Sequence, residues 1–148
     1  SPKAYLAFAG DGPLMEQMQQ LACQLGIQDR VNFLGTRSDI PILMRASVAT
    51  ILASEQEGLP RCVMESMSLG VPVIATEIRG TQDLLSQGCG LLVKVGDIQG
   101  LADAMGWVIA HPLEACMLGK QGRERMGMYD IRHIIELHEK LYAEAFFV

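Results

Sequence analysis

The fold is decided by the stretch Ser54-Glu-Gln-Glu-Gly-Leu-Pro-Arg-Cys-Val-Met-Glu65-Ser-Met-Ser-Leu-Gly70-Val-Pro-Val-Ile-Ala-Thr76. Its last seven residues are almost entirely apolar, which is typical of a short strand covered on both faces. The residues before them carry helical spacing from about Pro60 to Leu69. A helix that leads directly into a buried strand is the repeating element of an α/β sheet.

The same alternation extends along the whole chain. The expected strands cover residues 4–9, 31–34, 48–53, 72–75 and 90–93. The expected helices cover 14–25, a short segment after Asp39, 60–69, one or two turns in 81–86, a segment capped by Asp97 or Gln99, 114–126 and 131–145. Short connections between them predict a Rossmann-like α/β fold, with a parallel sheet and helices on both faces.

Composition narrows the function classes. A chain of 148 residues is expected to form one domain, and a net charge of −5 argues against nucleic-acid binding. No apolar run reaches the roughly 18–20 residues that span a bilayer, and no signal peptide opens the sequence. Four widely spaced cysteines predict free thiols in a reducing compartment. His133 and His138 lie five apart, which does not suit a metal site.

A glycine pair after the first strand, Gly10-x-Gly12, resembles the opening of a dinucleotide-binding loop. Met15 stands where the third glycine belongs, and Pro13 removes an amide that a pyrophosphate could use. The residues therefore favour a tight turn into a helix with Pro13 at its first position. Binding near a nucleotide base stays open, since parallel sheets bind ligands at the carboxyl ends of their strands.

Two acids, Glu57 and Glu65, flank the start of the helix over 60–69. Eight helical steps of about 100° would turn Glu65 only about 80° from the direction of Glu57, so both could face one ligand. Glu57 is also explained by helix electrostatics alone. Glu65, among apolar neighbours, is expected to need a partner or a ligand. Both readings stay open at this level.

The stretch from Glu57 through Glu65 to Thr76 resembles the glutamate-x7-glutamate signature of the family-4 (group 1) retaining glycosyltransferases. The order of Phe8-Ala-Gly-Asp-Gly-Pro13, Val31-Asn-Phe-Leu-Gly35, Asp39-Ile40 and the segment 88–93 also matches that family. The resemblance covers nearly the whole chain. It implies the C-terminal, donor-binding domain of an enzyme with two Rossmann-like domains, the GT-B architecture.

The resemblance also implies a role for each matching residue. Glu57 would contact the donor sugar near the reacting carbon, either as a nucleophile or as a stabiliser of positive charge. Glu65 would accept hydrogen bonds from the nucleotide ribose. The amides of Gly58 and Leu59 would hold the sugar or phosphate. The remaining expected contacts are the nucleobase pocket at Arg37 and Asp39, where helix capping by Asp39 is the alternative, and a pocket wall or turn at Ser54.

The sequence departs from the family pattern, and these departures limit the activity that we expect of this chain. We expect the N-terminal acceptor domain, the first strand of the donor domain and the arginine and lysine that bind the diphosphate to lie outside this chain. The fragment alone is therefore expected to be inactive, and the mechanism to need no metal or other cofactor. The alternatives are a noncatalytic sugar-nucleotide-binding or partner-binding module, a sugar-nucleotide epimerase of the same architecture, and a phosphate-receiver-like domain.

The setting is inferred from the resemblance alone. It implies polysaccharide or lipid-linked glycan assembly in the cytoplasm or at the inner face of the membrane, with membrane contact only through the intact enzyme. The last helix carries an apolar stripe that continues into Phe146-Phe147-Val148. This stripe either packs on the domain's own sheet or is exposed, and exposure would favour self-association.

Overall fold

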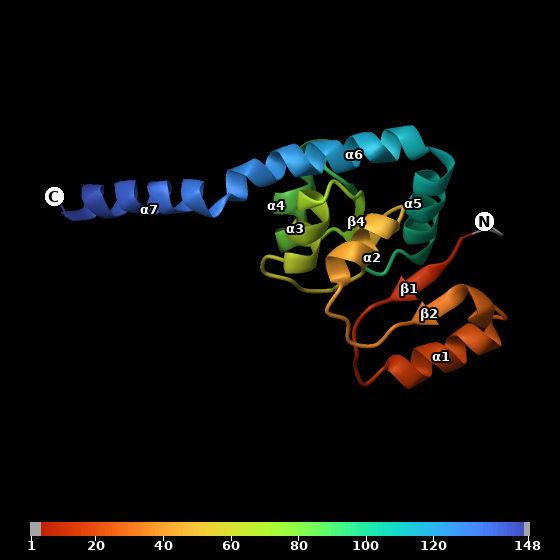
Figure 1. Cartoon of the computed structure of the whole chain (residues 1–148). Helices are drawn as coiled ribbons and strands as arrows, with labels where there is room; N and C mark the ends of the chain where they lie inside the picture. The colour runs from red at the N-terminus through yellow and green to blue at the C-terminus, as the bar shows by residue number, and fades with distance from the viewer. Residues whose placement is uncertain (1–3, 147–148) are drawn as a thin grey trace. The chain divides into compact units, whose positions relative to one another are not determined.

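The computed structural model describes residues 4–146, which fall into two compact units. The first unit ends at Leu43 and the second begins at Met44, within helix α2 (Ile40–Ala46). All strand pairs in both units are parallel, and helices connect them (Figure 1). The predicted α/β class is confirmed, although the strands form two sheets.

The first unit is a β-α-β element. Strand β1 (Leu6–Phe8) is followed by α1 (Met15–Gln24), the short 3-10 helix η1 (Gln28–Arg30) and β2 (Val31–Phe33). Phe8 opposes Phe33 in the register, and their rings stack with centroids 5.2 Å apart. Pro13 lies outside α1, so its expected place at the first helical position is wrong.

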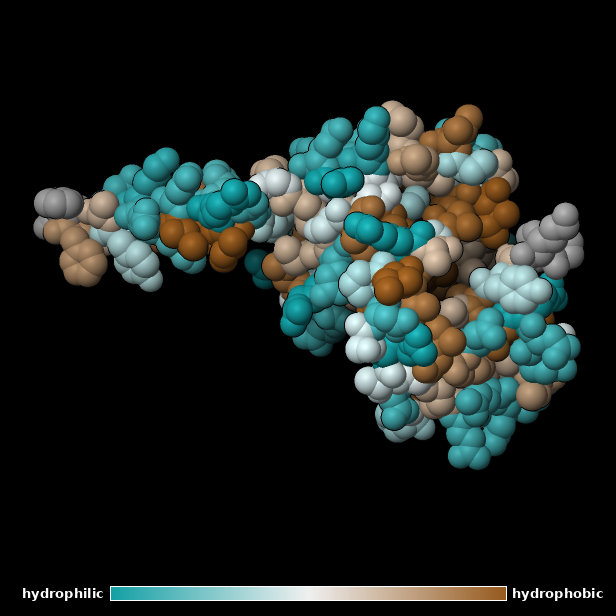
Figure 2. Space-filling model, in the orientation of Figure 1, coloured by the Kyte–Doolittle hydropathy of each residue, from teal (hydrophilic) through white to brown (hydrophobic). Residues whose placement is uncertain are grey.

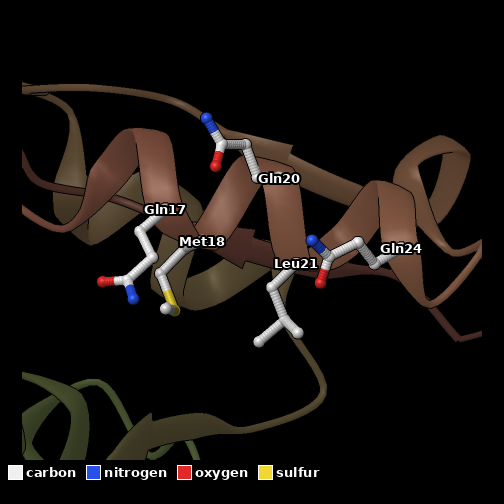
Figure 3. Close-up of a pocket in the computed structure, with 5 residues that line it drawn as sticks. All are labelled: Gln17, Met18, Gln20, Leu21 and Gln24. Carbon is white, nitrogen blue, oxygen red and sulfur yellow. The ribbon is translucent and has the colours of Figure 1, made fainter.

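The first strand is less covered than its apolar sequence predicts. Tyr5 and Phe8 are exposed, which corrects the expectation of a strand covered on both faces. The reason is the size of the element, because a two-stranded sheet with one connecting helix has little with which to cover a second face. A shallow hollow of about 230 Å³ lies on α1, where Met18 and Leu21 extend to the same side of the helix (Figure 3).

The second unit contains a three-stranded parallel sheet in the order β3-β4-β5. The sequence alternates strictly through this region. Its elements are β3 (Thr50–Leu52), α3 (Arg61–Ser68), β4 (Val73–Thr76), α4 (Arg79–Leu85), the 3-10 helix η2 (Ser86–Gly88) and β5 (Leu91–Val93). Four further helices follow: α5 (Ile98–Ala110), α6 (Pro112–Arg125), the 3-10 helix η3 (Met126–Tyr129) and α7 (Ile131–Phe146).

Helices cover both faces of this sheet. The side chains of β4 alternate between these two faces, so each face has side chains that pack against helices. Val73 and Ala75 pack with α3 and α4 on one face, whereas Ile74 packs with α5 on the other. All four residues of β4 are buried. Asp97 caps α5 by accepting a hydrogen bond from the Gly100 amide at 2.8 Å, as one of the two predicted caps.

Helix α6 crosses the amino end of the sheet. A Cβ on Gly119 would lie 2.2 Å from the carbonyl oxygen of Gly70, so the helix and the turn before β4 are in direct backbone contact. Gly70 itself has a φ of 74°, a conformation that glycine adopts without strain. The carboxyl end of the sheet, which carries the loops after β3 and β4, is therefore opposite the end that α6 covers.

The apolar stripe of α7 does not pack on the sheet. Ile131, Ile135, Leu141 and Tyr142 are exposed, and Figure 2 shows hydrophobic side chains gathered on one side of this helix. Phe147 and Val148, at the end of the predicted stripe, lie outside the described residues. Among the helices formed by residues 4–146, none combines the length and the hydropathy needed to cross a membrane.

Candidate functional site

The candidate site is built at the carboxyl ends of β3 and β4. Ser54 follows β3 by two residues, and Thr76 is the last residue of β4. The Ser54 amide donates a hydrogen bond to Thr76 Oγ1 at 3.0 Å, and Thr76 Oγ1 donates to the Ser54 carbonyl oxygen. These bonds hold the start of the loop that leads to α3.

Glu57 lies on this loop, four residues before α3 begins. The Ser54 hydroxyl donates to Glu57 Oε1 at 3.2 Å, and the Glu57 side chain is half-buried. Gly58 and Leu59 follow and are exposed. No described atom lies within 4 Å of a Cβ built on Gly58, so packing within the protein does not require a glycine there.

Glu65 is inside α3, as predicted, but it is not buried. Its carboxylate lies 3.6 Å from Arg61 Nη2, and the two side chains are 44% and 89% exposed, respectively. Val63 and Met67 face the core, which turns Arg61 and Glu65 to the solvent side of the helix. The expectation that Glu65 sits in apolar surroundings is therefore wrong, because those neighbours lie on the other face of α3.

Cys62 lies near both glutamates. The residue is exposed overall, but partial burial of its thiol raises the pKa above the ordinary value. The negative charges of Glu57 and Glu65 also raise this pKa, whereas a hydrogen bond from the Val63 amide lowers it. The direction of this shift agrees with the chain positions of the two acids, Glu57 four residues before α3 and Glu65 within it. The structure thus brings Ser54, Glu57 and Glu65 to one region of the second unit, with Gly58 and Leu59 between the two acids.

Arg37 and Asp39 belong to the first unit and bind each other. Arg37 Nε donates to Asp39 Oδ1 at 2.8 Å, and Arg37 Nη2 donates to Oδ2 at 2.6 Å. This pairing lowers the pKa of Asp39, chiefly through the hydrogen bond from Arg37. The Asp39 carbonyl oxygen accepts backbone hydrogen bonds from Ile42 and Leu43 at the start of α2.

The described hollows lie apart from the predicted site residues. A groove of about 570 Å³ runs along β5 and α5 and is lined by Glu77, Lys94, Asp97 and Trp107 among others. Within the described part of the chain, none of the predicted site residues lines this groove or the hollow on α1. No three His, Cys, Asp or Glu side chains between residues 4 and 146 are grouped so that they could hold a metal ion.

Sequence reasoning missed two contributors, Thr76 and Gly80. Thr76 was read only as the end of an apolar strand, yet its hydroxyl contacts Ser54. A Cβ on Gly80 would lie 2.3 Å from the Gly58 carbonyl oxygen, so the start of α4 touches the loop that carries Glu57. A hydroxyl residue at the last position of a buried strand was the available signal for Thr76. No local signal marked Gly80.

Comparison with known proteins places these features in a family. Residues 1–125 match the family described as glycosyl transferases group 1. The chain is 31% identical over 144 residues to the lipopolysaccharide core biosynthesis glycosyltransferase LpsE of Rhizobium meliloti, covering 96% of the chain and 42% of that protein. It is 32% identical over 141 residues to N-acetyl-alpha-D-glucosaminyl L-malate synthase of Bacillus anthracis, covering 94% of the chain and 37% of that protein.

Solved structures agree with the sequence matches. Anabaena Alr3699/HepE in complex with UDP has a TM-score of 0.87 and 28% identity, over 97% of this chain and 42% of that one. The same protein with UDP-glucose has a TM-score of 0.86 at the same identity and coverage. The chain spans about two fifths of the length of the relatives that it matches. By its sequence and its fold, the chain belongs to the group 1 glycosyltransferases.

Proposed function

We propose that this chain is the donor-binding part of a retaining glycosyltransferase, a hexosyltransferase that moves a sugar from a nucleoside-diphosphate sugar to an acceptor. A growing polysaccharide or a lipid-linked glycan is the acceptor class that we propose, at the cytoplasmic side of the membrane. The observation that carries the proposal is Glu57, held by Ser54 at the carboxyl end of a parallel sheet. Ligands of open α/β sheets bind at this end.

The two glutamates have different proposed tasks. Glu57 contacts the hydroxyls of the donor sugar and faces its reacting carbon, as a nucleophile or as a stabiliser of developing positive charge. Glu65 accepts hydrogen bonds from the ribose hydroxyls, which suits a carboxylate that is half exposed and only loosely paired with Arg61 at 3.6 Å. Ligand binding can exchange this weak surface ion pair at little cost.

The loop between the acids would hold the sugar or the phosphates. Gly58 and Leu59 are exposed residues in this loop, and we expect their backbone amides to donate to the ligand. The empty space around Gly58 supports close approach by a ligand, because no described atom lies within 4 Å of a Cβ built there. We expect the same loop to be more ordered when the donor is bound.

Arg37 and Asp39 would contact the nucleobase. Their charges compensate each other in a bidentate pair, so the pair itself has no net charge. An uncharged base edge fits such a pair better than a diphosphate does. The diphosphate would be bound by cations and backbone dipoles of the intact enzyme, without a metal. Without those cations and an acceptor site, we expect no sugar transfer by the fragment.

Uridine is the nucleotide to test first, because Anabaena HepE, with 28% identity, has been solved with UDP and with UDP-glucose. A ligand-detected magnetic resonance screen would compare uridine, guanosine and adenosine diphosphate sugars with the wild-type chain. Glu65→Ala should weaken binding of the nucleotide itself, and Glu57→Ala should mainly remove the contribution of the sugar. Glu55→Ala, which removes the same charge from an exposed position on the same loop, is the matched control.

Equal binding by the wild type, Glu57→Ala and Glu65→Ala would refute the assignment of the site. Turnover by the fragment in a coupled assay with donor and acceptor would refute its inactivity. Donor binding by a longer form of the protein that never transfers sugar would favour the noncatalytic module.

The exposed stripe on α7 supports a further property, self-association. Leu141 and Tyr142 are both about 60% exposed, and they add to the exposed apolar surface of Ile131 and Ile135 on the same helix. Light scattering should show association that rises with protein concentration, and Leu141→Glu should reduce it. A monomer at high concentration in the wild type would contradict this expectation.

A further inference from the structure

We propose that Thr76 and Gly80 are positioning residues for Glu57. In this view β4 and the start of α4 fix the acid that faces the donor sugar. The inference rests on the proposed function, because it assigns to Glu57 the contact with the sugar. It adds two residues from a different part of the chain, neither of which carries a charge.

Thr76 first holds the backbone of Ser54 by hydrogen bonds. The backbone register of β3 and β4 ends with Leu52 opposite Ala75. Beyond that point the Thr76 hydroxyl accepts from the Ser54 amide at 3.0 Å and donates to the Ser54 carbonyl oxygen. One side chain thus satisfies both backbone groups of Ser54 and continues the pairing of the two strands into the loop.

The second step links Ser54 to the acid. With its backbone fixed, Ser54 places its hydroxyl 3.2 Å from Glu57 Oε1, closer than its other acceptor, the Gln56 carbonyl oxygen at 3.4 Å. A carboxylate that accepts a directed hydrogen bond is restricted in rotation, so its free oxygen has a defined direction. Thr76 therefore acts on Glu57 through Ser54, over two hydrogen bonds. Only 8% of the Thr76 residue is exposed, which excludes most competing water.

The third step fixes the loop from behind. Thr81, which is fully buried, donates to the Thr76 carbonyl oxygen and accepts from the Ile78 amide at 3.1 Å. These bonds turn the chain sharply after β4 and bring Gly80 against the loop. A Cβ at Gly80 would lie 2.3 Å from the Gly58 carbonyl oxygen and 3.0 Å from that of Glu57. The absence of a side chain at Gly80 thus lets α4 support the backbone of Glu57.

Thr50 provides a matched comparison for Thr76. It lies at the other end of the same pair of strands, and its hydroxyl is 2.6 Å from the Ser66 hydroxyl. Loss of either threonine hydroxyl removes a hydrogen bond from a largely buried position. Only the Thr76 hydroxyl is connected to Glu57, so the two threonines separate positioning from stability.

The experiment measures dissociation constants for UDP and for UDP-glucose with the 148-residue chain. The dissociation constant for UDP divided by that for UDP-glucose reports how much the sugar adds to binding. The thermal unfolding temperature reports whether the fold is intact. Thr76→Val should reduce this ratio by roughly three- to tenfold, the range expected for loss of one hydrogen bond. Thr76→Ser, which keeps the hydroxyl, should restore the ratio. Thr50→Val should lower the unfolding temperature and leave the ratio as in the wild type.

A ratio unchanged in Thr76→Val, or lowered equally in Thr50→Val, would overturn the inference. If Thr76→Val does not fold, Ser54→Ala tests the same path, and an unchanged ratio there would also overturn it. Glu57→Ala separates the inference from the function on which it rests. If that variant loses the sugar contribution and Thr76→Val does not, only the positioning role fails. If the wild type binds neither ligand, the proposed function fails and the inference with it.

Discussion

The two ends of the β3-β4-β5 sheet are built in different ways. At the amino end, α6 rests on the turn before β4 through glycines in backbone contact. At the carboxyl end, hydroxyl groups hold a loop that carries an acid. Backbone also packs closely at this end, where Gly80 meets the Gly58 carbonyl oxygen, but no described atom lies within 4 Å of a Cβ on Gly58. Directed hydrogen bonds beside this open space orient a side chain and keep it accessible. Both ends therefore contribute to stability, and the carboxyl end adds open space beside an acid.

The largest effect is expected at the amino end. In Gly119→Ala the new methyl group would overlap the Gly70 carbonyl oxygen, because its Cβ would lie 2.2 Å from that atom. We expect the free energy of unfolding in urea to fall by about 2–3 kcal/mol. Gly106→Ala, in the middle of α5 with no described atom within 4 Å of the new Cβ, should instead gain about 0.5–1 kcal/mol.

Similar losses in Gly119→Ala and Gly106→Ala would show that helix glycines matter only through general effects. The specific contact between α6 and the turn at Gly70 would then contribute nothing to the stability of the fold. The proposed role of backbone contact at the amino end of the sheet would then be unsupported.

A second, smaller effect is expected from the two glycines that meet at the carboxyl end. Gly80→Ala would force the loop at Gly58 to move, and we expect it to cost about 1–2 kcal/mol of unfolding free energy. Gly58→Ala meets open space and should change stability by no more than about 0.5 kcal/mol. Both variants should bind UDP-glucose more weakly, as isothermal titration calorimetry would show. Unchanged binding by Gly58→Ala would mean that no ligand approaches this loop closely.

Part of this arrangement could be predicted from the sequence. Apolar runs such as residues 73–76 predicted the strands because burial on both faces leaves a continuous hydrophobic signal. The spacing of Glu57 and Glu65 placed one acid before α3 and one within it, as the structure has them. The sequence misjudged Glu65, since neighbours in a helix point in all directions and only their rotation shows which face is buried.

The contacts of Thr76 and Gly80 were not predictable from spacing. They join residues 22 positions apart in the chain, Ser54 with Thr76 and Gly58 with Gly80. Such pairs depend on the register of β3 against β4 and on the turn into α4. The division of the strands into two sheets was likewise not visible, because alternation of strands and helices does not specify which strands pair.

The smallest effect is expected outside both ends of the sheet, at the start of α7. The hydrogen bond from Arg132 lowers the pKa of Asp130 to about 2, and the Arg132 amide bonds the same carboxylate at 2.9 Å. An unfolded aspartate titrates near 3.9. The stabilisation is therefore present above about pH 4 and is lost as the pH falls towards 2. The protection factor of the Arg132 amide, which is the intrinsic exchange rate divided by the measured rate at the same pH, should fall in this window, and Asp130→Asn should remove this change.

We propose that the loop after β3 and the adjoining face of α3 bind a nucleotide sugar. The most direct test is a map of backbone amide shifts in the labelled 148-residue chain during titration with UDP-glucose and, separately, with UDP. We expect both ligands to shift the amides around Glu65, and only UDP-glucose to shift those from Ser54 to Glu57. Shifts gathered instead in the groove along β5 and α5, or identical maps for the two ligands, would contradict the account.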